Sequence, residues 1–98
     1  MPERFADPET RLIAEGLQTK ATRRLLPSNL HPKAVRLIDY VLRARLPQAC
    51  AIFSGFKMLH GPLRGTYQLD VGKAHRLRFE WHEDRAVNIS VGEFHDED

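Results

Sequence analysis

The pattern of apolar and polar positions divides the chain into a helical first half and a β second half. An amphipathic helix is predicted from His31-Pro32 to near Pro47, with apolar residues on one side (Val35, Ile38, Val41, Leu42) and charged residues on the other (Lys33, Arg36, Asp39, Arg43). A shorter helix is predicted from Pro8 to Glu15, because Asp7 is a good N-cap and proline suits the first helical position. Leu12 and Ile13 would form its buried side.

After Gly55 the apolar period falls from about 3.6 to 2, as expected when helices give way to a sheet. Alternation predicts strands at 66–71, 76–81 and 87–91, with a further strand at 56–59 and an edge near 4–5. The expected core stripe is Tyr67, Leu77, Phe79 and Trp81, and the expected polar side is Arg76, Arg78, Asn88 and Ser90. The sequence therefore predicts one α+β domain over 1–98, with two N-terminal helices packed on one face of a small twisted antiparallel sheet.

Charge is unevenly distributed although the formal net charge is only +2. From Lys20 to Arg78 there are twelve Lys/Arg against Asp39 and Asp70, a local +10, whereas Trp81 to Asp98 has one arginine against six acids, a local −5. Basic surfaces bind phosphate backbones by releasing counterions. The open polar side of the sheet, between the loop at 57–64 and the tail at 92–98, is therefore a candidate nucleic-acid site.

Several other classes of protein are disfavoured by the sequence. The lone Cys50 has no disulfide partner and lies in an apolar stretch, where we expect it to pack in the core. No signal-peptide pattern and no run of about 18 apolar residues is present, so we expect a cytoplasmic protein without membrane contact. The histidines at 31, 60, 75, 82 and 95 lack metal-ligand spacing, and no metal or other cofactor is expected.

Three segments of the second half carry a family resemblance: KMLHGPLRGTY at 57–67, HRLRF at 75–79 and GEFH at 92–95. In order and spacing they resemble the RelE superfamily of toxins, and its HigB branch most closely. That branch is typically written with a Leu-His-Pro-Leu-Lys-Gly loop, a Gly-Tyr/Trp strand, a Trp/Tyr/His-Arg-Ile/Leu-x-Phe strand and a closing Asp-Tyr-His. The resemblance extends over about 4–95, with its motifs confined to the second half.

The resemblance implies the toxin of a type II toxin-antitoxin system, an endoribonuclease that cleaves messenger RNA on the ribosome and so inhibits translation. It also implies a partner, a HigA-like helix-turn-helix antitoxin that holds the toxin in check. The reaction is attack of a ribose 2′-hydroxyl on the adjacent phosphate. It requires a proton acceptor, positive charge at the phosphate and a proton for the leaving 5′-oxygen.

The resemblance also assigns residues to the expected site. Arg76 matches the family's strand arginine, whose planar fork binds two phosphoryl oxygens, and we expect its replacement by alanine to change stability by only about 0.5 kcal/mol, as at surface positions. His60 and Lys57 stand where the family has a lysine and a histidine, as though exchanged. The expected catalytic residues are Arg76, His95, His60 and Glu93, and the expected RNA-binding residues are Lys57, Arg64, Arg78 and Phe94.

Two departures from the family pattern keep other functions open. Glu93 replaces an aspartate, and Phe94 replaces a tyrosine, which removes a phenolic proton donor but keeps a ring that can stack on a base. The first alternative is a ParE-like toxin that inhibits DNA gyrase without cutting RNA. The second is a non-catalytic basic adaptor that binds nucleic acid.

Overall fold

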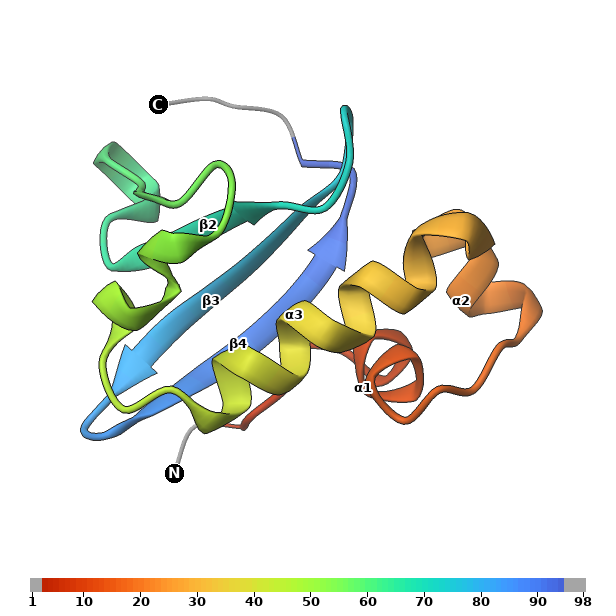
Figure 1. Cartoon of the computed structure of the whole chain (residues 1–98), viewed down its shortest axis with the longest axis horizontal. Coiled ribbons are helices and arrows are strands. Elements are labelled where there is room, and N and C mark those ends of the chain that lie inside the picture. The colour runs from red at the N-terminus through yellow and green to blue at the C-terminus, as the bar shows by residue number, and fades with distance from the viewer. Residues whose placement is uncertain (1–2, 95–98) are drawn as a thin grey trace.

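The computed structural model, which describes residues 3–94, has its helices before its sheet in sequence (Figure 1). The α-helices are α1 (Pro8–Ala14), α2 (Lys20–Leu25) and α3 (His31–Arg43). The strands are β1 (Lys57–Met58), β2 (Thr66–Asp70), β3 (Arg76–His82) and β4 (Arg85–Gly92). Short 3₁₀ segments lie between them at η1 (Ser28–Leu30), η2 (Pro47–Ile52) and η3 (Gly61–Leu63). The predicted α+β class is confirmed.

Local capping explains where the helices begin. Asp7 is the N-cap of α1, and its Oδ1 accepts a hydrogen bond from Thr10 N at 2.7 Å, as the sequence predicted. Helix α2 was not predicted. It begins with a reciprocal capping box between Thr19 and Thr22, so the signal was a Thr-x-x-Thr spacing rather than the more familiar Ser/Thr-x-x-Glu. Helix α3 ends at Arg43, earlier than predicted, because the chain becomes extended at Ala44 and Pro47 opens η2.

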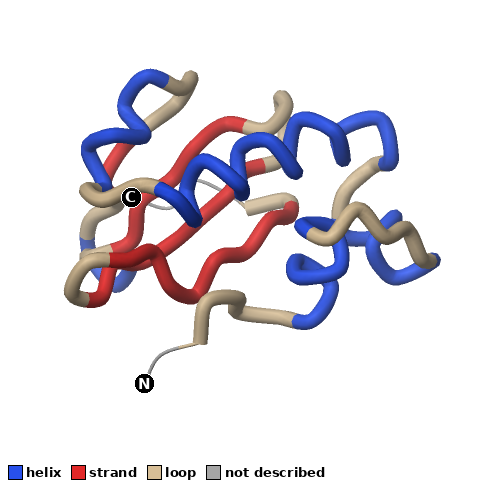
Figure 2. Tube along the Cα trace, turned by 60° about the horizontal axis from the view of Figure 1, so that its bottom comes forward, coloured by secondary structure: helices blue, strands red, loops and turns tan. Residues whose placement is uncertain are grey.

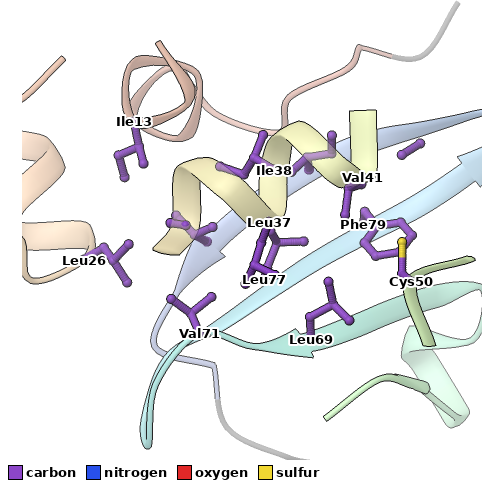
Figure 3. Close-up of a cluster of buried hydrophobic side chains, with 14 residues drawn as sticks. Ile13, Leu26, Leu37, Ile38, Val41, Cys50, Leu69, Val71, Leu77 and Phe79 are labelled. Carbon is purple, nitrogen blue, oxygen red and sulfur yellow. The ribbon is translucent and has the colours of Figure 1, made fainter. Parts of the chain in front are cut away.

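The sheet is antiparallel in the order β1-β2-β3-β4, and α3 lies across one of its faces (Figure 2). Helix α1 contacts α3, α2 and β4. Figure 3 shows side chains of α3 and of the strands directed toward one another in the space between the two layers. The buried cluster comprises Ile13, Leu26, Ala34, Leu37, Ile38, Val41, Cys50, Leu69, Val71, Leu77, Phe79, Ala86, Ile89 and Val91. The expected core stripe is confirmed, since Leu77 and Phe79 are buried and Tyr67 and Trp81 pack against the cluster.

The outer edge of β4 is covered by the N-terminal segment. Asn88 N donates to Glu3 O at 2.8 Å and Ile89 N donates to Arg4 O at 2.9 Å, so the predicted edge near 4–5 does pair with the sheet. Further along β4, Val91 N donates to Thr10 Oγ1 at 3.2 Å. Pairing of this edge leaves few exposed backbone groups for another strand to join.

A β-bulge at Asn88 changes which residues of β4 face the core. Asn88 has a left-handed φ of 51°, and the register shifts between the pairs Arg78↔Ser90 and Glu80↔Val87. Val87 consequently lies beside Glu80, outside the main buried cluster, although it is only 2% exposed. Strict alternation over the predicted strand 87–91 would place Val87 on the same face as Ile89 and Val91, and the bulge moves it to the opposite face. Ala86, opposite Trp81, takes that place.

Burial of Cys50 leads to a prediction about its chemistry. Its side chain is 0% exposed, and desolvation raises the pKa of the thiol to about 11. At mildly alkaline pH we expect an alkylating reagent to label Cys50 rapidly in the unfolded protein and hardly at all in the native protein. The thiolate is the reactive form, and burial disfavours it in the native state. Intact-mass measurement before and after adding denaturant checks this. Equal labelling of both states would contradict the burial.

The same shift has a consequence for stability at high pH. The folded-state pKa of Cys50 lies above the ordinary value of 9.0. The contribution of the protonated thiol to the free energy of unfolding is therefore fully present below pH 9.0 and is lost as the pH rises through about 11.

Candidate functional site

The sheet surface opposite α3, here called the polar face, carries a row of polar side chains across all four strands. Register pairs Lys57 with Gln68, Gln68 with Arg78, and Arg78 with Ser90. Residues paired in register lie on the same face of a sheet, and adjacent strands are about 4.8 Å apart. Lys57 and Arg78 are thus roughly 10 Å apart at Cα on one surface. Two of the predicted RNA-binding residues lie together here.

Gln68 is the buried member of this row. It is 1% exposed, whereas Lys57, Arg78 and Ser90 are partly exposed. Its Oε1 accepts a hydrogen bond from Arg78 Nε at 2.9 Å. The alternation of β2 indicates only the face on which Gln68 lies, because it reveals neither the burial of a side chain nor its partner.

Phe94 packs against the guanidinium of the same arginine. Arg78 Cζ lies 4.5 Å from the centroid of the Phe94 ring, which is the geometry of a cation–π contact. Phe94 follows β4 after Gly92 and Glu93, so the end of the described chain is brought against the centre of the polar face. Arg78 is therefore held from two directions, by Gln68 along its edge and by Phe94 against its plane.

Arg76 lies one row away and has a different environment. Its Nε forms an ion pair with Asp70 Oδ1 at 3.1 Å. Its Nη1 donates to three carbonyl oxygens of the β2–β3 turn, those of Gly72 at 2.9 Å, Lys73 at 3.1 Å and His75 at 3.1 Å. Within residues 3–94, only Nη2 of this guanidinium is without a hydrogen-bond partner.

This environment corrects one expectation about Arg76. The side chain does leave the core face, as predicted, but it is only 18% exposed and ties the turn to β2. Replacing it will therefore cost more stability than a surface substitution does. Gly55, which precedes β1, lies against the Asp70 carboxylate, and its φ of +76° and this close approach leave no room for a Cβ atom.

His60 and Arg64 lie at the far end of the polar face from Arg76. Both are exposed and flank η3, and Leu59 N donates to Thr66 O at 2.8 Å just before His60. Thr66 and Asp70 are four residues apart in β2, which corresponds to roughly 13 Å along a strand. The structure thus does not bring His60 close to Arg76, and one phosphate would not reach both.

The remaining predicted site residues lie beyond the end of β4. Gly92 is the register partner of Arg76, which places the exposed Glu93 next to that row. His95 falls outside the described residues. The predicted site is therefore divided into a central part (Lys57, Arg78, Phe94), an end containing Arg76 and Glu93, and a distant loop with His60 and Arg64.

Within 3–94, no three His, Cys, Asp or Glu side chains are grouped so as to hold a metal ion. No helix in that range has both the length and the apolar character to span a bilayer. Comparison of the chain with known protein families, with curated proteins and with solved structures gave no match.

Proposed function

We propose that this chain is an RNA-cutting toxin of the RelE type, a ribosome-dependent endoribonuclease that acts on messenger RNA. The observation that carries the proposal is the group formed by Arg78, Phe94 and Lys57 on the polar face. A cation stacked on an aromatic ring, beside a second cation, is suited to bind single-stranded nucleic acid, because the cations attract its phosphates and the ring can stack on its bases. The sequence resemblance described above supplies the reaction.

The polar face offers the proposed chemistry a defined set of groups. Arg76 Nη2 and the Arg78 guanidinium would place positive charge on the phosphate as the 2′-oxygen attacks it. Glu93, beside the Arg76 row, is the candidate acceptor of the 2′-hydroxyl proton, and His95 the candidate donor to the leaving 5′-oxygen. His60 and Arg64 would contact a different part of a bound strand.

The proposal includes a partner and a location. A nuclease that destroys messenger RNA arrests its own cell, so a restraining protein is required, and a HigA-like helix-turn-helix antitoxin is the proposed one. Messenger RNA and ribosomes also place the proposed action in the cytoplasm.

One observation favours a second candidate, the non-catalytic nucleic-acid-binding adaptor. The predicted residues that lie together are those for holding RNA, whereas His60 lies apart from Arg76 and Phe94 has no proton to donate. An adaptor would bind RNA through the same polar face and leave it intact.

Expression of the chain alone in a bacterial cell tests the proposal. We expect growth arrest with rapid loss of full-length messenger RNA, while the supercoiling of a reporter plasmid stays unchanged. Arrest with intact messenger RNA and altered plasmid topology would indicate the gyrase inhibitor instead. Normal growth with intact transcripts would indicate the non-catalytic adaptor.

A further inference from the structure

We infer that Gln68 is a positioning residue that orients Arg78 toward a phosphate of bound RNA. The inference rests on the proposed function and extends it, because Gln68 belongs to none of the expected catalytic or RNA-binding residues. It concerns the centre of the polar face, where Gln68 lies between Lys57 and Arg78 in register.

The first argument is the burial of Gln68. An amide side chain that is 1% exposed on an otherwise half-exposed face must form hydrogen bonds, because an unsatisfied buried polar group costs about 1–3 kcal/mol. The bond from Arg78 Nε to Gln68 Oε1, at 2.9 Å, meets this need. It also fixes Arg78, because the acceptor belongs to a buried side chain on an inner strand of the sheet.

The second argument is the direction of this bond. Gln68 engages Nε, and the Phe94 ring lies against the guanidinium at 4.5 Å. These two contacts together set the direction of the terminal Nη1/Nη2 edge. That edge is the one that binds two phosphoryl oxygens in parallel, and such a contact depends on orientation as well as charge.

The third argument is the charge of Gln68. Arg76, on the same strand, is held by a carboxylate, that of Asp70. Gln68 is neutral, so it orients Arg78 without reducing the positive charge that attracts a phosphate.

Two substitutions test this with a fluorescently labelled single-stranded RNA, whose dissociation constant is measured by anisotropy over a range of KCl concentrations. Gln68→Met keeps the volume and removes the acceptor. We expect it to weaken binding roughly tenfold and to reduce the slope of log affinity against log salt by about 0.7, the value for one phosphate contact on a single strand. Gln68→Glu keeps the acceptor but adds a negative charge. We expect it to reduce the salt slope by the same amount and to keep a melting temperature close to that of the parent.

Thr10→Val is the matched control. Thr10 is likewise a buried polar residue, and its Oγ1 accepts a hydrogen bond from Val91 N at 3.2 Å on the β4 edge. Its loss should lower the melting temperature and leave the salt slope unchanged. If Gln68→Met only lowers the melting temperature, or if Gln68→Glu binds RNA as the parent does, Gln68 is structural and the inference is wrong. A parent protein that binds no RNA would instead overturn the proposed function.

Discussion

Arg76→Ala is expected to destabilise the protein and to abolish most of its RNA cleavage. The substitution removes an ion pair to Asp70 and three hydrogen bonds to turn carbonyls, and the loss of hydrogen bonds to a charged group costs about 1.5–3 kcal/mol. It also removes Nη2, the donor that we propose contacts the phosphate. Deleting a single positioned donor from an oxyanion site typically slows a reaction by about 10² to 10³. Thermal melting and a cleavage assay below the melting temperature measure the two effects separately.

Two control variants separate the two roles of Arg76. Asp70→Asn disturbs the same turn but keeps the arginine, so it should lower the melting temperature and preserve most of the cleavage. Arg85→Ala removes a charge from the exposed first residue of β4 and should change neither property. An Arg76→Ala protein that melts like the parent would contradict the role in the turn. A folded Arg76→Ala protein with full cleavage activity would contradict the role at the phosphate.

Arg78→Ala is expected to cause the largest loss of RNA affinity. It removes a charged contact, which corresponds to about 1.5–3 kcal/mol and hence roughly a 10- to 100-fold weaker dissociation constant. It also releases the Phe94 ring from its stacking partner. Stability should fall as well, because the substitution takes the Nε donor away from the buried Oε1 of Gln68.

Arg78→Lys is the matched control for the fork of the guanidinium. It keeps the charge but loses the Nε contact with Gln68 and the planar fork, so we expect an intermediate affinity with most of the salt slope retained. Anisotropy titration with the same labelled RNA gives both values. An alanine variant with parental affinity would show that RNA does not bind to the centre of the polar face.

The elements that sequence predicted well are those with a strong local signal. Asp7-Pro8 marked the start of α1, and strict alternation marked β2 and β3, because capping and period depend on neighbouring residues. Helix α2 is only six residues long and lacks a clear apolar period, so the Thr19–Thr22 box was its main signal. The bulge at Asn88 inserts one residue into the alternation of β4, and such an irregularity depends on pairing with a strand elsewhere in the chain.

The candidate site was predictable as a surface but not as a set of contacts. Alternation placed Arg76 and Arg78 together on the polar side, and the structure agrees. It did not reveal that Asp70 and the turn carbonyls hold Arg76, because those partners come from β2 and from the loop that follows it. Nor did it show that η3 keeps His60 apart from Arg76, since the course of a loop is fixed by tertiary packing.

The central claim is that the protein cuts messenger RNA by attack of a 2′-hydroxyl. It is tested most directly by incubating the purified chain with ribosomes on a defined message and analysing the RNA ends. We expect cuts within the message that leave a 2′,3′-cyclic phosphate on one fragment and a 5′-hydroxyl on the other, with both products lost in folded Arg76→Ala. A message that stays intact on the ribosome, or one that is cut equally well by the folded variant, would contradict it.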